Sequence, residues 1–195
     1  FFFKVFSRNF VLQVLKEGAS HQDRMPNRSV EEILFAAHLL PALGLPGDLD
    51  SVLRALKADE RSKQPWDICV EVEGKSLRVD YDGEYYHDLS RAEHDEDKTL
   101  LHLYRNKRDI VCRVRVGKCP DLWGLTLSSQ DEERCAVIPI AKGLTPSRQV
   151  AETMFELHHF LPVQVPRTSA PFLTLDQRKN AERVGIKAVR ALFYS

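Results

Sequence analysis

The sequence lacks a long apolar run, an excess of charge and a cysteine pattern typical of metal or disulfide sites. No stretch approaches the roughly 18 apolar residues of a membrane span, so we expect no membrane partner. The 28 basic and 28 acidic side chains cancel, which leaves any attraction to nucleic acid to local patches. The four cysteines form no C-x-x-C pair. We therefore expect free thiols in an intracellular, reducing compartment.

What the sequence does contain is the composition of a globular protein. Hydrophobic residues make up 43% of the chain and charged residues 29%, as in soluble folded domains. A length of 195 residues allows one domain with additions. The first residue is not Met, so we expect the chain to be part of a larger polypeptide or complex.

Capping signals and helical spacing predict six helices. The clearest start is Ser29, which Glu32 follows three residues later in the capping-box pattern. Another helix begins near Glu93, where acidic residues in the first turn suit the helix dipole. The predicted helices cover approximately residues 8–16, 30–40, 49–57, 93–104, 146–161 and 175–193.

Two β-rich runs, residues 67–72 and 75–82, predict a hairpin with one buried face. Glu73-Gly74 lies between them and suits a two-residue turn. In that register the numbers of paired residues sum to 147, so Asp67 faces Asp80 across the hairpin. Directly opposed carboxylates repel each other, which indicates that a cation balances them.

Asp82 is expected beside Asp80, because alternate side chains of a strand share one face. A register slipped by two residues would pair Asp67 with Asp82 and keep the acids together. Clustered carboxylates with water as a further ligand suit Mg²⁺ or Mn²⁺. The alternative is a solvated acidic edge of an ordinary hairpin.

Further strands are predicted after the hairpin. Residues 109–116 give a third strand, and residues 122–127 and 134–140 could add edge strands, since Pro139 suits an edge or a strand end. Four cations share one face of the last helix, where they form either a stripe that contacts a nucleic-acid backbone or a solvated surface. They are Lys179, Arg183, Lys187 and Arg190.

Five short motifs follow one another in an order that resembles a known nuclease pattern. They are S-x-x-E at residues 29–32, Asp67, D-x-D-G-x-x-x-H at residues 80–87, D-x-x-K at residues 95–98 and V-x-R-V-R at residues 111–115. This arrangement resembles the PD-(D/E)XK nuclease superfamily, and most closely its very-short-patch-repair-like branch. The resemblance covers about residues 29–117.

The resemblance implies an α/β fold with a restriction-endonuclease-like core, in which helices flank a central mixed β-sheet. Residues 29–117 would form this core. Residues 1–28 would be an N-terminal extension, and residues 118–195 a C-terminal extension of strands and helices packed on the core. Extra helices are therefore expected at both ends.

The same resemblance implies a metal-dependent endonuclease that hydrolyses phosphodiester bonds of nucleic acid, with DNA the expected substrate, as in DNA repair. It implies that Asp67 and Asp80 hold Mg²⁺ or Mn²⁺, and that Glu32 completes the site directly or through water. Helix capping alone also explains Glu32, and Glu31 is the alternative acid if the helix is rotated.

The sequence departs from the superfamily at two positions. Asp82 stands where the catalytic strand lysine is expected, and Asp80 replaces the commoner glutamate. Lys98, one helix later, could supply the missing cation from a migrated position. His87 is either a general acid or base, or a phosphate contact, or a partly exposed residue at a strand end.

Arg113 and Arg115 either face substrate phosphate or simply flank the sheet, and His158 and His159 are expected to be structural. The departures leave two rival interpretations. One is a catalytically inactive, nucleic-acid-binding domain that resembles the RNA-binding RAP domains. The other is an interaction module of a larger protein with solvated acids.

Overall fold

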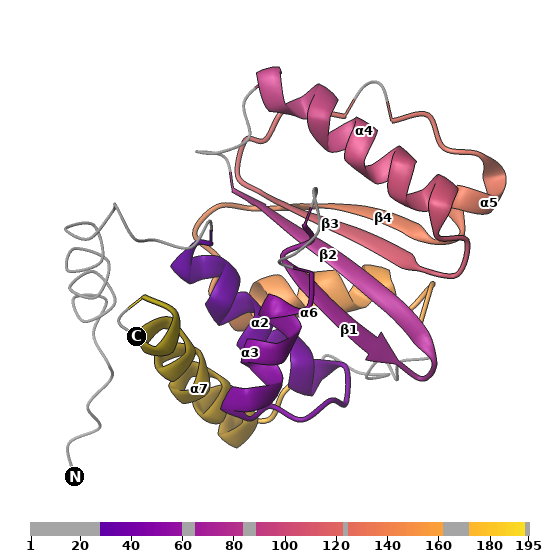
Figure 1. Cartoon of the computed structure of the whole chain (residues 1–195). Coiled ribbons are helices and arrows are strands. Elements are labelled where there is room, and N and C mark those ends of the chain that lie inside the picture. Colours follow the sequence, from indigo (N-terminus) through magenta and orange to yellow (C-terminus); the bar gives the residue numbers. More distant parts are fainter. Residues whose placement is uncertain (1–27, 60–64, 84–88, 123–124, 162–171, 194–195) are drawn as a thin grey trace, which may run out of the picture.

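The computed structural model describes residues 28–59, 65–83, 89–122, 125–161 and 172–193 (Figure 1). These residues form an α/β fold in which helices flank one four-stranded mixed sheet. The strands are β1 (Ile68–Val72), β2 (Lys75–Gly83), β3 (Ile110–Val116) and β4 (Cys135–Ile140). The helices are α2 (Val30–Ala42), α3 (Leu49–Lys57), α4 (Leu89–Arg105), α5 (Ser129–Glu132), α6 (Pro146–Leu157) and α7 (Leu175–Phe193).

The sheet has the order β1-β2-β3-β4. β1 and β2 are antiparallel, whereas β3 and β4 run parallel to β2. A parallel pair needs a crossover, and α4 supplies the one between β2 and β3. The predicted mixed sheet flanked by helices is thus confirmed, and β4 with its Pro139 lies at the sheet edge as expected.

The predicted hairpin register is also confirmed. Ile68 pairs with Val79 and Val72 with Lys75. Glu73 and Gly74 form the turn with φ values of 48° and 79°. Two successive positive φ angles are those of a type I′ turn, whose twist matches that of the flanking strands. The two-residue loop therefore fixes which side chains of β1 and β2 are neighbours.

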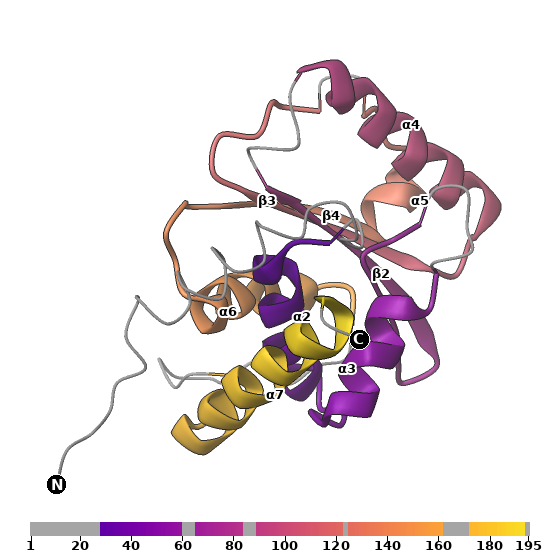
Figure 2. The same ribbon diagram turned by 60° about the vertical axis from the view of Figure 1, so that its left-hand side comes forward.

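Helices cover both faces of the sheet. α4 lies on one face, and α2, α3, α6 and α7 gather on the other (Figures 1 and 2). α2 is the central helix of this second layer, since it contacts α3, α6 and α7. Its residues from 35 to 40 are all buried, as expected for a helix surrounded by protein. The C-terminal helix α7 therefore shares one core with the sheet.

Helix starts agree with the predicted caps, with one exception. The Ser29 hydroxyl accepts from the Glu32 amide at 3.0 Å, and the Glu32 carboxylate accepts from the Ser29 amide at 3.3 Å. α4 begins at Leu89, one turn before the predicted start. Leu89, Arg91 and Ala92 are good helix formers, so the acidic residues lie beyond the first turn. None of the described helices is long and apolar enough to cross a membrane.

The predicted edge strand at residues 122–127 is wrong. Its described residues belong to no strand, and the Leu125 amide instead donates to the Leu122 carbonyl at 3.1 Å. Residues 1–27, with the predicted helix at 8–16, lie outside the described part of the chain. The same holds for His87 and for most of the segment between α6 and α7.

Candidate functional site

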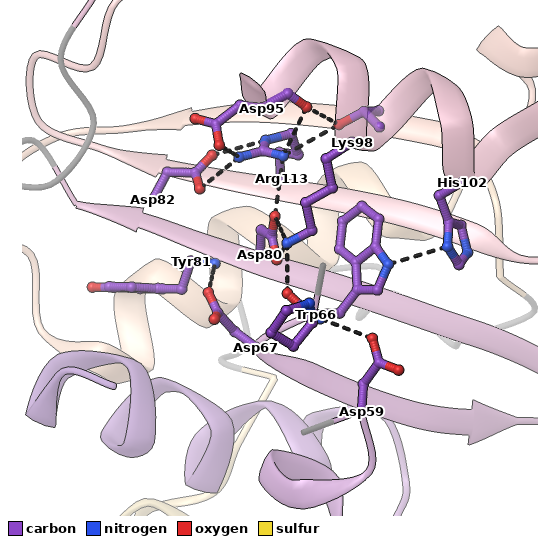
Figure 3. A network of polar contacts seen from close by, with 12 residues as sticks. Asp59, Trp66, Asp67, Asp80, Tyr81, Asp82, Asp95, Lys98, His102 and Arg113 are labelled. Carbon is purple, nitrogen blue, oxygen red and sulfur yellow. Dashed lines mark hydrogen bonds and ion pairs between the residues drawn. The ribbon is translucent and has the colours of Figure 1, made fainter. Parts of the chain in front are cut away.

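The acidic cluster lies where β2 continues past the start of β1. β1 begins opposite Val79, and among the described residues no strand pairs with residues 80–83 on that side. Asp67, directly before β1, fills this gap by accepting from the Tyr81 amide through Oδ2 at 2.8 Å (Figure 3). The carboxylate thus takes the place of a strand partner, which holds it at the sheet edge beside Asp80.

Glu32, Asp67 and Asp80 come together from three different segments. Glu32 lies in the first turn of α2, and both Glu32 and Asp80 are buried. Burial, opposed by Arg28 and reinforced by the charge of Asp80, raises the pKa of Glu32 to about 7. Burial, followed by the charges of Glu32 and Asp80, raises the pKa of Asp67 well above its usual range. The charge of Asp80 therefore opposes the ionisation of both Glu32 and Asp67.

Arg28 is the first of two cations in this cluster. Its Nη1 lies 2.5 Å from Glu32 Oε1, 2.6 Å from the Asp67 carbonyl oxygen and 4.0 Å from Asp67 Oδ1. Its Nη2 donates to the Leu56 carbonyl in the last turn of α3. A single guanidinium thus joins the start of α2, the end of α3 and the segment before β1.

Lys98 is the second cation, and it points from α4 toward the acids (Figure 3). Its Nζ lies 2.8 and 2.7 Å from the two oxygens of Asp80 and 2.7 Å from the Pro65 carbonyl. It also lies 4.4 Å from the centre of the Trp66 ring. The migrated lysine that the sequence suggested therefore reaches the candidate site.

A buried arginine joins this site to a second acidic pair. Arg113 is 0% exposed, and its Nε and Nη2 bind both oxygens of Asp82 at 2.9 and 2.8 Å. Its Nη1 lies 3.0 Å from Asp80, and its Nη2 lies 3.0 Å from Asp95. Buried carboxylates persist only with such partners, so Arg113 makes this group of acids possible inside the fold.

Asp82, Arg113 and Arg115 form one buried group of ion pairs. Both Asp82 oxygens are bound by Arg113, and Arg115 Nη1 adds a contact to Oδ2 at 2.9 Å. Arg115 is buried and also donates to the Pro120 carbonyl at 2.6 Å. Both guanidinium groups are thus buried and engaged by carboxylates, and a contact with phosphate stays a prediction of the sequence.

The four cations of α7 lie apart from the acidic cluster, on a helix that packs against α2 and α3. Lys179, Arg183, Lys187 and Arg190 are all exposed. Arg183 and Lys187 also line a hollow of about 440 Å³ beside the start of α3. An exposed stripe is compatible with both alternatives, a backbone contact and a solvated surface.

The carboxylates of Glu32, Asp67 and Asp80 are suitable ligands for a divalent ion, although side-chain cations of the protein lie between them. Within the described ranges, no three side chains of the metal-binding types lie close enough together to hold an ion as placed. Arg28 lies between Glu32 and Asp67, and Lys98 binds Asp80. The carboxylate oxygens are those that Mg²⁺ and Mn²⁺ prefer. Burial is the largest cause of the raised pKa values of Glu32 and Asp67, and the charges of Arg28 and Lys98 act in the opposite direction.

Sequence reasoning missed Arg28 and Trp66. The i,i+4 spacing of Arg28 and Glu32 was a signal for their ion pair, whereas the contacts of Arg28 with Asp67 and of Trp66 with His102 join residues distant in the chain. For Trp66, its position next to Asp67 was the only available signal. Comparisons with protein families, curated proteins and solved structures found no match for this chain.

Proposed function

We propose that this chain is a metal-dependent endonuclease of the PD-(D/E)XK, restriction-endonuclease-like type, and that DNA is its substrate. One observation carries the proposal. Asp67 and Asp80, from the two arms of the hairpin, lie at one sheet edge with the Lys98 ammonium bound to Asp80. Acids and a lysine in this combination are the minimum needed for hydrolysis of a phosphodiester with a divalent ion.

Asp67 and Asp80 would hold Mg²⁺ or Mn²⁺, with Glu32 as a further ligand directly or through water. The ion would polarise the phosphate and lower the pKa of the attacking water. Asp67 is the accessible member, since 26% of its side chain is exposed, compared with 5% for Asp80. Binding would require Arg28 to leave the space between Glu32 and Asp67, Lys98 to release one of the two Asp80 oxygens, and Glu32 to lose its proton.

Lys98 would stabilise the negative charge that develops on the phosphate and on the leaving oxygen. It takes this part because Asp82 occupies the usual lysine position on β2 and is bound by Arg113 and Arg115. The exposed stripe of α7 would add contacts to the nucleic-acid backbone. A role for His87 as general acid or base remains a prediction of the sequence.

Cleavage of supercoiled plasmid and of RNA in Mg²⁺ tests the proposal, with Asp80→Ala as the inactive variant. Asp50→Asn is the matched control, because Asp50 is an exposed acid on α3. We expect wild type and Asp50→Asn to cleave DNA and Asp80→Ala to leave it intact. Wild-type protein that leaves every substrate intact would overturn the enzyme proposal.

A second candidate function is binding of nucleic acid, RNA in particular, without cleavage. One observation favours it, namely that β2 carries no lysine beside Asp80 and that Asp82 is committed to the two arginines. Salt-dependent binding of RNA by a wild-type protein that cleaves nothing would support this function over the first. Absence of any binding would instead favour an interaction module.

A further inference from the structure

The indole of Trp66 lies between Lys98 and His102 on the α4 side of the sheet (Figure 3). The Lys98 ammonium is 4.4 Å from the indole centre, within the range of a cation–π contact. The indole Nε1 donates to His102 Nδ1 at 3.1 Å, and the two rings meet edge to face at 5.0 Å. Only 2% of Trp66 is exposed, so the indole itself is shielded from water.

Asp109 fixes the orientation of His102. The imidazole Nε2 lies 3.0 Å from Asp109 Oδ2. Because Nδ1 accepts from the indole, Nε2 carries the hydrogen and donates to the carboxylate. Asp109 Oδ2 also accepts from Arg78 Nε at 3.2 Å. Arg78 lies two residues before Asp80 on the same face of β2. A continuous series of contacts therefore joins Asp80 to Arg78 through Lys98, Trp66, His102 and Asp109.

The backbone on either side of Trp66 is also held. The Trp66 amide donates to Asp59 Oδ2 at 3.0 Å, and the Pro65 carbonyl accepts from Lys98. Lysine has four rotatable side-chain bonds and loses considerable entropy when it is fixed. An ordered indole face and a carbonyl beside Asp80 together restrict where the ammonium can lie.

We propose that Trp66 and His102 are positioning residues, which hold the Lys98 ammonium on Asp80 through the indole ring. The inference deepens the function proposed above, because it assigns two further residues to the same site. Without the indole, Lys98 loses one of its fixed contacts and can turn toward solvent. Without His102, the indole N–H is buried without an acceptor and the ring loses its fixed orientation.

Ordinary packing is the rival explanation, since Trp66 also contacts a small apolar cluster with Leu103 and Val111. Variants that keep or remove the hydrogen-bonding groups and the aromatic face at these two positions separate the two explanations. His102→Gln keeps an acceptor and a donor, whereas His102→Leu keeps volume only. Trp66→Phe keeps an aromatic face without the N–H group, whereas Trp66→Leu removes the face.

The first measurement follows Lys98 itself and needs no activity. Mass spectrometry measures the rate at which an amine-reactive acylating reagent modifies Lys98. The exposed Lys57 is the internal reference. We expect acylation to be about 10-fold faster in Trp66→Leu and in His102→Leu, the rate change that corresponds to the energy of a cation–π contact. In His102→Gln we expect a rate close to that of wild type. Rates equal to wild type in both leucine variants would overturn the proposal.

Trp66→Phe keeps the test decisive if the leucine variants fail to fold, and should give an intermediate rate. A rate in Trp66→Phe equal to that of wild type would then overturn the proposal.

The second measurement is steady-state cleavage of DNA. We expect kcat to fall in His102→Leu and recover in His102→Gln, with KM for DNA unchanged. Faster acylation in a protein that cleaves nothing would keep the positioning role and reject the nuclease. Cleavage by wild type with unchanged kcat in His102→Leu would reject the positioning role alone.

Discussion

Glu32 and Asp67 are acids whose surroundings favour the protonated form. Burial and neighbouring carboxylates raise the pKa of both groups. The folded protein therefore binds their protons more tightly than the unfolded chain does. Their contribution to stability is complete below the pKa of the unfolded chain and is lost as the pH rises through the folded value.

For Glu32 this loss falls between pH 4.5 and about 7. We expect the free energy of unfolding of metal-free protein to fall across this window, by an amount on the order of 2 kcal/mol. Denaturant titrations in EDTA at several pH values measure it. Glu32→Gln should flatten the profile, because glutamine also serves the capping box but does not titrate. An unchanged slope in this variant would assign the effect to other groups.

Asp67→Asn should raise the melting temperature in EDTA. The substitution removes the repulsion from Glu32 and Asp80, and the amide oxygen can still accept from the Tyr81 amide. Differential scanning calorimetry checks this, with Asp50→Asn as the exposed control. A lower melting temperature for Asp67→Asn in EDTA would count against a repulsive acidic cluster.

Arg113→Met should be among the most damaging substitutions in the chain. Arg113 is completely buried and binds Asp80, Asp82 and Asp95. Its loss leaves buried carboxylates without their partner, at a cost of about 3–5 kcal/mol. We expect little folded protein, compared with normal yield and melting temperature for the exposed Arg54→Met control on α3. Near-native stability of Arg113→Met would show that Asp80, Asp82 and Asp95 do not depend on Arg113 for their burial.

The hairpin is the element that sequence predicts best. Its alternating apolar residues and its two-residue turn are local, so the pairing of β1 with β2 up to Ile68 and Val79 could be predicted from the sequence alone. Only the pair of Arg28 with Glu32 is local, and its contacts with Asp67 and Leu56 could not be predicted because they span 39 and 28 residues of sequence. The partners of Asp82 depend on which strand lies beside β2. That strand, β3, enters the sheet only after the α4 crossover.

The crossing of α2 and α7 depends on Gly185. A Cβ atom at this position would lie 2.8 Å from Leu34 Cδ2 and 3.3 Å from Ala37 Cβ. We expect Gly185→Val to lower stability by about 1–3 kcal/mol, the usual cost of overpacking a core. Gly185→Ala should cost less, because the end of Leu34 can move and alanine favours the helix.

Chemical denaturation measures the difference between the two variants. Lys187→Val, on the exposed side of the same helix, controls for the helix propensity of valine. Equal stability of Gly185→Val and the control would mean that the two helices have room to separate.

At the scale of the whole molecule, binding of a divalent ion should stabilise the fold. An ion that binds only the folded state adds about 2.7 kcal/mol at 100 times its dissociation constant. We expect Mn²⁺ to raise the melting temperature relative to EDTA, and more strongly at pH 8 than at pH 6, because the ion must replace the Glu32 proton. Asp67→Asn should weaken the shift, and an identical shift in that variant would place the ion elsewhere.

The positions of the four cysteines make their thiols reporters of the opening of the sheet. Cys69, Cys112 and Cys135 are buried in or beside the sheet, whereas Cys119 is partly exposed. Burial raises the pKa of all four thiols, so access to the reagent is what distinguishes Cys119 from the other three. A thiol-specific alkylating reagent should therefore modify Cys119 first and reach the other three only when the strands separate. Counting the alkyl groups by mass over time would then measure how often the sheet opens.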